Sequence, residues 1–247
     1  MASTAERMYR PVSELVASDH AWGNRSELVL VRDVAETSRA VQARRLLNII
    51  VAAVSLVLLI PLMMLIAVTI KLTSKGPVFF KQTRVGVDRR HGSGGNWRRK
   101  VDYGGRLFTI YKFRTMTDGN SSAEVWAMPG DDRVTKVGRF LRTYRLDELP
   151  QLINVLKGDM NIVGPRPEQP RIFLELRDVV DRYHERQRVL PGITGWAQIN
   201  QPYDRNIDDV RQKIRYDLEY ARNVSAVRDL KIMLKTVPVV LLGKGGW

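Results

Sequence analysis

The feature that most constrains this chain is an apolar block at residues 46–70, which contains no charged residue. As an α-helix rising ~1.5 Å per residue, the block would reach roughly 37 Å, which is long enough to enter or cross a bilayer. Soluble helices of this length normally carry a polar face, so a buried core helix is the weaker interpretation. The block predicts a membrane helix over residues 44–73, between a loosely ordered arm at 1–43 and a polar domain at 74–247.

Two features bear on whether this helix spans the membrane or turns back within it. Lys and Arg residues flank both ends of the block, and such residues favour the cytoplasmic side. Pro61 lies past the middle, where it removes a backbone hydrogen bond and kinks the helix. Both features favour a re-entrant helix that enters and leaves by the cytoplasmic face, although an ordinary proline-kinked span explains them equally well. The flanking cations are Arg39, Arg44, Arg45, Lys71, Lys75, Lys81 and Arg84.

The charge balance points to a polyanionic partner. The 247 residues include 40 Lys and Arg against 26 Asp and Glu, which gives a formal net charge of +14. Nucleic acid, anionic lipid and pyrophosphate substrates would each suit this excess. The chain has no cysteine and three histidines, which excludes thiolate zinc sites and disfavours a histidine-built metal site, so any metal would have oxygen ligands. No nucleic-acid-binding motif is present, so no nucleic acid partner is expected.

Short elements separated by loops occupy the polar domain, as in a small α/β fold. The last helix carries an apolar stripe, which suits a membrane surface or a soluble core equally well. In chain order, we expect an apolar stretch at 78–80, a solvated insertion at 88–105, a strand at 107–113, a helix at 149–156 ended by Gly158, charged helices at 179–189 and 207–223, and a helix at 230–237.

An adjacent acidic pair, Asp147 and Glu148, is the first candidate for chemistry. Pro150 follows it and suits the first turn of a helix, where Asp is a favoured N-cap, and this structural role weighs equally with a functional one. A helix N-terminus and nearby arginines would keep Asp147 ionised, so that it could act as a nucleophile while Glu148 helps to hold Mg²⁺. The cations before the pair are Arg133, Lys136, Arg139, Arg142 and Arg145.

Two further motifs are candidates for ligand binding. In Gly164-Pro165-Arg166-Pro167 the prolines fix the backbone, so Arg166 would be oriented for bidentate phosphate recognition. A turn with a solvated arginine explains that motif equally well. Residues 191–198, PGITGWAQ, read as a turn that leads into a strand-like segment. Their two glycines permit close approach of a ligand, or serve turn chemistry alone.

Several short motifs follow one another in a recognisable order. They are SKGPVFFKQ at residues 74–82, RVG at 84–86, YKFRTM at 111–116, RLDELPQL at 145–152, GDM at 158–160, VGPRP at 163–167 and PGITGW at 191–196. In this order they resemble the bacterial sugar transferase family, the monotopic phosphoglycosyl transferases that begin capsule, exopolysaccharide and glycoprotein-glycan synthesis. The resemblance covers roughly residues 44–240.

The resemblance implies a small α/β catalytic core on the cytoplasmic face of the bacterial inner membrane, with a re-entrant membrane helix and surface amphipathic helices. The implied reaction transfers a sugar 1-phosphate from a UDP-sugar to polyprenyl (undecaprenyl) phosphate, releasing UMP through a covalent aspartyl-phosphosugar. Mg²⁺ is the implied cofactor, inner-membrane lipids are implied partners, and a homodimer is compatible with the resemblance. The rival functions are a membrane phosphatase and a membrane-tethered nucleic-acid-binding protein.

The family's motifs also imply roles for single residues. Its catalytic pair is an aspartate nucleophile with a glutamate near magnesium, and a functional lysine lies in the strand before that pair. Its phosphate-binding arginine stands in a Pro-Arg-Pro motif, and a carboxylate lies in a Tyr-containing helix near the end. The expected catalytic residues are Asp147, Glu148 and Lys112, with Glu148 also the metal ligand, and the expected substrate-binding residues are Arg166, Arg114, Arg133, Pro165, Pro167 and Asp217.

Two departures from the family's pattern matter. The Ser-Pro pair common at the helix break is Ile60-Pro61 here, so the membrane break rests on Pro61 alone. Residues 201–205 read QPYDR, where many members have Gly-Arg and an aromatic-bearing segment. Because that segment is expected to border the sugar or the nucleotide, the family's sugar specificities are not carried across.

Overall fold

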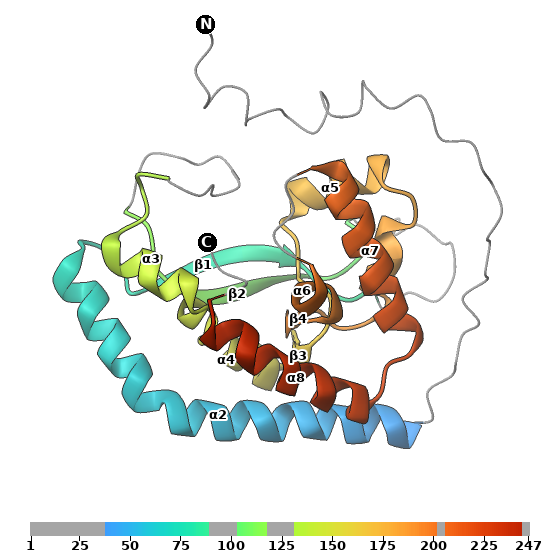
Figure 1. The fold of residues 1–247 in the computed structure, drawn as a ribbon, viewed down its shortest axis with the longest axis horizontal. Coiled ribbons are helices and arrows are strands. Elements are labelled where there is room, and N and C mark those ends of the chain that lie inside the picture. The colour runs from blue at the N-terminus through green and yellow to red at the C-terminus, as the bar shows by residue number, and fades with distance from the viewer. Residues whose placement is uncertain (1–37, 89–102, 118–130, 202–205, 244–247) are drawn as a thin grey trace, which may run out of the picture.

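The computed structural model describes residues 38–88, 103–117, 131–201 and 206–243. Most of the expected arm and insertion, and most of the QPYDR segment, lie outside the described residues. The described part contains both helices and strands, as expected for a small α/β fold. Figure 1 shows its long helix along one side of the molecule, with the strands and the other helices gathered above it.

The apolar block forms most of helix α2 (Ser38–Thr73), which is 36 residues long and contains Pro61. The helix begins ahead of the expected residue 44. It bends along its course (Figure 1), as a helix does where proline removes a hydrogen bond of the ladder. Only 11% of its most apolar stretch is buried, so α2 is not a buried core helix, and its length and composition would allow it to cross a membrane.

The strands form two small pairs. β1 (Phe79–Val85) and β2 (Leu107–Phe113) are antiparallel, with Phe80 opposite Lys112. β3 (Asn161–Val163) and β4 (Gly192–Thr194) are parallel. The strand expected at residues 107–113 is confirmed as β2, and the apolar stretch at 78–80 leads into β1.

The remaining helices confirm part of the expected pattern. The helix expected to end at Gly158 is confirmed as α4. Gly158 adopts a left-handed φ of 87°, a conformation that commonly ends helices. The expected helices at 207–223 and 230–237 are α7 and α8. In chain order the elements are α3 (Lys136–Thr143), η1 (Leu146–Glu148), α4 (Gln151–Lys157), α5 (Pro170–Val179), η2 (Tyr183–Arg188), α6 (Trp196–Asn200), α7 (Ile207–Arg222) and α8 (Ala226–Leu241), where η marks a 3-10 helix.

The helix expected at residues 179–189 is wrong. Pro170 occupies the first helical turn and starts α5 earlier, since its missing N–H is not needed there. Val180 then leaves the helix in extended geometry, and Arg182 adopts a left-handed φ of 60°. Residues 183–188 therefore form only the short helix η2. The strand-like segment expected after the turn at 191 is the three-residue strand β4, which α6 follows.

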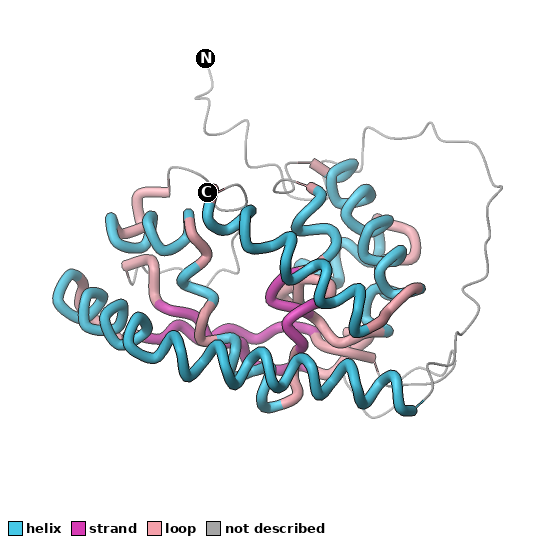
Figure 2. The backbone as a smooth tube through the Cα atoms, turned by 60° about the horizontal axis from the view of Figure 1, so that its bottom comes forward, coloured by secondary structure: helices cyan, strands magenta, loops and turns pink. Residues whose placement is uncertain are grey.

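The core consists of several clusters, one of which lies among the end of β1, α5, η2 and α7, while two others lie between α2 and the strands. Ala52 packs with Phe108 and Ile110 of β2, while Ile66 and Ile70 pack with Phe113. Figure 2 shows α2 running alongside the strands in a second view. The inner side of α2 therefore belongs to the core of this domain, although most of its surface is exposed.

Polar contacts fix the first turns of α2 to the rest of the fold. The buried Arg44 side chain lies 2.8 Å from Asp229 of α8 and donates to the Tyr220 hydroxyl at 2.6 Å. Asn48 accepts a hydrogen bond from the Ile162 amide of β3 at 2.7 Å, and Arg45 donates to the Met160 carbonyl at 3.0 Å. Two of the cations expected to flank the membrane segment are therefore internal anchors.

Candidate active site

The acidic pair lies in η1, between α3 and α4. Arg145 adopts a left-handed φ of 53°, which turns the chain sharply into Leu146–Glu148. The residue before α4 is Pro150, and no side chain caps either helix. The interpretation of Asp147 as an N-cap is therefore wrong. Both carboxyls are instead buried, with 7% of Asp147 and 4% of Glu148 exposed, which requires compensation for any charge they carry.

Glu148 receives that compensation mainly from two cations, while Arg145 Nη1 lies farther away, 4.0 Å from Oε2. Lys112 of β2 places Nζ 2.8 Å from Glu148 Oε1. Arg166 grips the same carboxylate with both ends of its fork, Nη1 to Oε2 at 3.1 Å and Nη2 to Oε1 at 2.5 Å. Burial alone would raise the pKa of Glu148, but Arg166 and Lys112 outweigh it and hold that pKa well below its usual range. Glu148 is thus a fixed anion.

Asp147 has a different environment. Burial raises its pKa to about 6, against the opposing effect of Lys112. The helix N-terminus and nearby arginines were expected to keep this carboxyl ionised at neutral pH. A pKa of about 6 leaves it mostly ionised there, at a cost set by burial. Within the described part of the chain, no group donates a hydrogen bond to the Asp147 carboxylate. An ionised carboxylate that is poorly solvated and unpaired by hydrogen bonds is a reactive one.

Lys112 links the two acids. It is largely enclosed, with 16% of its side chain exposed. Burial lowers the pKa of its ammonium, Glu148 raises it and Arg166 lowers it again. Its position in β2, one residue before the buried Phe113, fixes the side chain toward η1. The strand therefore supplies the cation that both acids share.

The Pro-Arg-Pro loop is held by its backbone. Gly192 donates to the Pro165 carbonyl at 3.0 Å, Arg186 to the Arg166 carbonyl at 2.9 Å, and Arg84 to the Pro167 carbonyl at 3.2 Å. Because Arg166 is paired with Glu148 and only 32% of its side chain is exposed, the alternative of a solvated turn arginine is wrong. The loop presents one guanidinium to the acidic pair in a fixed direction.

A second buried ionic group lies behind this loop. Asp217 of α7 pairs with Arg186 at 2.7 Å, and Lys213 pairs with Glu168 at 2.8 Å. Burial alone would raise the pKa of Glu168, but Lys213, Arg186 and Arg84 lower it to about 2. Asp217 is therefore joined to the site through Arg186 and the loop. Only Asp217 of this group was expected, from the family resemblance, whereas Arg186, Glu168 and Lys213 were missed.

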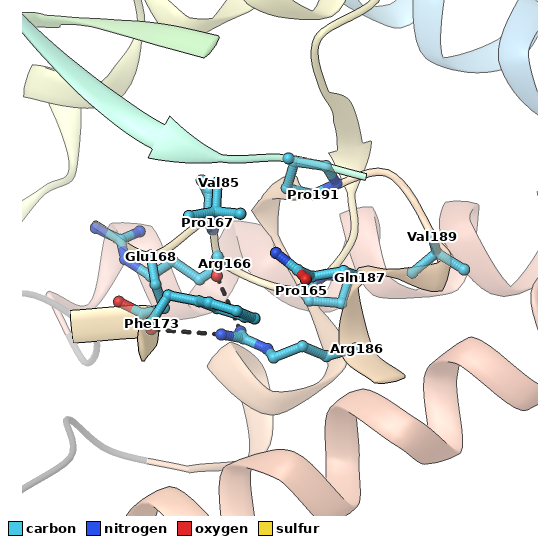
Figure 3. Close-up of a pocket in the computed structure, with 11 residues that line it drawn as sticks. Val85, Pro165, Arg166, Pro167, Glu168, Phe173, Arg186, Gln187, Val189 and Pro191 are labelled. Carbon is cyan, nitrogen blue, oxygen red and sulfur yellow. Dashed lines mark hydrogen bonds and ion pairs between the residues drawn. The ribbon is translucent and has the colours of Figure 1, made fainter. Parts of the chain in front are cut away.

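A pocket that opens to solvent lies beside the same loop, with about 250 Å³ of space that includes its open mouth. Figure 3 shows Gln187 directed into it and the Arg166 carbonyl bonded to Arg186. The Oε1 atom of Gln187 is buried and accepts no hydrogen bond from the described residues. The lining residues are Val85, Gly86, Pro165, Arg166, Pro167, Glu168, Phe173, Arg186, Gln187, Val189 and Pro191.

The other expected substrate-binding cations are engaged elsewhere. Arg114 donates to the carbonyls of Ser74 and Lys75 at 2.9 and 2.6 Å, so it ties the end of β2 to the end of α2. Arg133 pairs with Asp131 at 2.6 Å. The structure thus brings together Asp147, Glu148, Lys112 and Arg166 of the expected site. Pro165 and Pro167 flank Arg166 in the same loop.

Magnesium is compatible with this pair of acids. In the described ranges no three acidic, histidine or cysteine residues cluster as a complete metal cage. Mg²⁺ commonly binds one or two carboxylates and takes its other ligands from water and substrate phosphates. Glu148 Oε1 accepts from Lys112 and Arg166, and Oε2 accepts from Arg166, which leaves a lone pair of Oε2 available.

Comparison with known proteins places this arrangement in context. The family model described as bacterial sugar transferase matches residues 39–243. A UDP-N-acetylgalactosamine-undecaprenyl-phosphate N-acetylgalactosaminephosphotransferase of Aeromonas hydrophila is 43% identical over 82% of this chain and 44% of its own. A UDP-glucose:undecaprenyl-phosphate glucose-1-phosphate transferase of Caulobacter vibrioides is 41% identical, over 80% and 69%. The exopolysaccharide production protein ExoY of Rhizobium meliloti is 34% identical, over 83% and 88%. The chain spans less than half of the Aeromonas protein's length.

Proposed function

Because this chain belongs to the bacterial sugar transferase family, we propose that it transfers a sugar 1-phosphate from a UDP-sugar to undecaprenyl phosphate and releases UMP. The observation that carries the proposal is the contrast within the acidic pair. Asp147 is buried with a pKa of about 6 and free of hydrogen bonds from the described residues, while two cations hold Glu148 beside it. This is the arrangement of one nucleophile and one fixed acid.

The proposed reaction has two steps at one phosphorus atom. An oxygen of the Asp147 carboxylate attacks the phosphorus that bears the sugar, and the bond from that phosphorus to the bridging oxygen breaks, so UMP leaves. An oxygen of undecaprenyl phosphate then attacks the same phosphorus, and Asp147 is released as a carboxylate. Dividing the exchange in this way means that the two anionic substrates never have to react with each other directly.

Cations around the acidic pair would stabilise the charge that develops on the phosphoryl oxygens. Arg166 has a planar guanidinium on a backbone that Arg186 holds in place. This group pairs with Glu148 and would also bind phosphate oxygens of the substrate. Lys112, which pairs with Glu148 at 2.8 Å and interacts electrostatically with Asp147, would add a second positive charge. Magnesium, held by Glu148, would screen the pyrophosphate and act as a Lewis acid on it.

The location proposed for this reaction is the cytoplasmic face of the bacterial inner membrane. Helix α2 exposes a long apolar surface, which includes Leu58 and Leu65 at 72% and 64% exposure. Water would make such a surface costly, whereas lipid tails would cover it. The exposed apolar stripe of α8, with Leu230 and Leu234, would lie at the lipid surface beside cations of the same helix.

The first prediction tests the nucleophile. Asp147→Asn should leave the fold intact and abolish turnover, since the amide is of similar size but cannot attack phosphorus. Wild-type protein incubated with a UDP-sugar and no lipid acceptor should gain the mass of one phosphosugar on Asp147, detected by mass spectrometry after rapid quenching. UDP-glucose and UDP-N-acetylgalactosamine belong in the donor panel, because they are named in the relatives above.

Two other outcomes would point elsewhere. If UMP appears only when donor and acceptor are both present, with no adduct, transfer is direct and Asp147 serves as a ligand. If free sugar phosphate accumulates without lipid acceptor, the protein is a phosphatase. The matched control is Asp208→Asn, an exposed aspartate of α7 whose loss should leave the rate unchanged.

A further inference from the structure

Phe80 of β1 is an exposed aromatic residue beside the acidic pair. Its partner across the antiparallel ladder is Lys112, and residues directly opposite each other share one face of a sheet. Lys112 reaches Glu148 from that face. Arg84 lies on the same face by the two-residue period of the strand, and it reaches the Pro167 carbonyl. The face that carries Phe80 is therefore the one directed at the site.

The exposure of Phe80 is not explained by packing. It is 47% exposed, and it belongs to none of the core clusters or aromatic pairs of the described residues. Phe79 is a matched neighbour, 44% exposed but on the opposite face, where its ring stacks on buried Phe113 at a centroid distance of 5.5 Å. Phe79 thus has a structural partner, while Phe80 offers an apolar ring at the rim of a charged site.

The end of α2 that exposes apolar side chains lies near the start of β1, where Phe80 is. Arg114 follows β2 directly, and its backbone amide donates to the Val78 carbonyl at 2.8 Å. Its side chain holds the carbonyls of Ser74 and Lys75, just past the end of α2. The end of the sheet with Phe80 and Lys112 therefore adjoins the end of α2. The last turns of α2 expose Leu65, Val68 and Leu72 at 64%, 55% and 81%.

We propose that Phe80 binds the polyprenyl chain of the acceptor, next to its phosphate. This inference rests on the proposed function and names the acceptor's place in that site. An apolar ring opposite Lys112, which itself pairs with Glu148, suits a ligand whose phosphate is attached directly to a hydrocarbon chain. The nucleotide-sugar has no such chain, whereas the acceptor would slide along the exposed end of α2 with its phosphate toward the cations.

The test compares Phe80→Ser with the matched control Phe79→Ser. Binding is measured in the Asp147→Asn background, so that no turnover is needed, with undecaprenyl phosphate in detergent micelles and with inorganic phosphate as the headgroup alone. Phe80→Ser should weaken binding of undecaprenyl phosphate roughly tenfold, the effect of uncovering much of one aromatic side chain. Binding of inorganic phosphate should not change, and Phe80→Leu should restore most of the affinity.

Phe79→Ser loses a ring contact with the core, so it should lower thermal stability while leaving lipid affinity intact. Equal loss of lipid affinity in both serine variants, or none in Phe80→Ser, would overturn the inference. Weaker binding of the UDP-sugar in Phe80→Ser would assign the ring to the donor instead. These binding results are independent of the adduct experiment, so the proposed reaction can fail while the lipid site stands, and the reverse.

Discussion

Asp147 and Glu148 are adjacent in the chain, yet the fold moves their pKa values in opposite directions. Burial raises the pKa of Asp147 to about 6, because Lys112 offsets the loss of water only in part. Glu148 is also buried, but direct ion pairs with Arg166 and Lys112 hold its pKa well below the usual range. All four of these residues were expected from the sequence. The sequence could not predict their pairing, which depends on β2, η1 and the Pro-Arg-Pro loop meeting in space.

These shifts predict opposite effects on stability. With a folded pKa of about 6 against 3.8 in the unfolded chain, Asp147 lowers stability as pH rises from about 4 to 6, and the cost is complete above that. Asp147→Asn should therefore raise the free energy of unfolding at pH 7.5 by up to about 3 kcal/mol, and this gain should vanish near pH 4. Urea unfolding in detergent at both pH values measures it.

Glu148→Gln is the companion variant. The pKa of Glu148 is lowered on folding, so its stabilising effect is present above about pH 4.5 and is lost as pH falls. The glutamine variant should be less stable than wild type at pH 7.5.

The opposite result for the first variant, a lower stability of Asp147→Asn than of wild type at pH 7.5, would show that the Asp147 carboxylate is well paired and not strained by burial.

At the scale of elements, periodicity predicted those whose signals are local. The strand-like composition of residues 107–113 predicted β2, and Gly158 predicted the end of α4. The segment 179–189 failed because charged residues at helical spacing do not reveal a left-handed residue such as Arg182. The bend in α2 was foreseen from Pro61, but the anchors at its two ends were not, since Asp229 and Arg114 are distant in sequence.

Those anchors predict the topology of α2. Arg44 ties its start to α8, and Arg114 ties the segment after its end to β2. Both ends are thus attached to one domain, and a single domain would lie on one side of a hydrocarbon layer about 30 Å thick. Because the chain lacks cysteine, single reporters at Ala40→Cys and Asp208→Cys can be labelled with membrane-impermeant maleimide. Both should react only from the cytoplasmic side.

Periplasmic labelling of the Ala40 reporter, with the Asp208 reporter still cytoplasmic, would show that α2 spans the membrane. Pro61→Ala restores the missing N–H and favours a straighter helix. It should therefore increase the fraction of Ala40 reporter that is labelled from outside. The arm before Ser38 lies outside the described residues, so the reporters are placed on residues whose surroundings are known.

For the whole molecule, the expected division at residues 43 and 73 stays a prediction, and packing contacts cross it at residue 73. Helix α2 supplies Ala52, Ile66 and Ile70 to the clusters that bury β2. It also holds β3, which leads directly into the Pro-Arg-Pro loop, through Asn48 and the Ile162 amide. Because α2, the proposed membrane helix, contributes core residues and ion pairs to the rest of the fold, changes at its first turns should reach the site.

The Arg44–Asp229 pair allows this coupling to be measured. Asp229 is fully buried, so Arg44→Ala leaves a charge without its ion-pair partner and should destabilise the protein by about 3–5 kcal/mol. Replacing both partners, as Arg44→Met with Asp229→Leu, should cost less, because no charge is left buried. Arg171→Ala removes the exposed pair with Glu175 and should cost about 1 kcal/mol at most. If Arg44→Ala and Arg171→Ala lower the free energy of unfolding in detergent by the same small amount, α2 is an appended anchor and the catalytic domain folds without it.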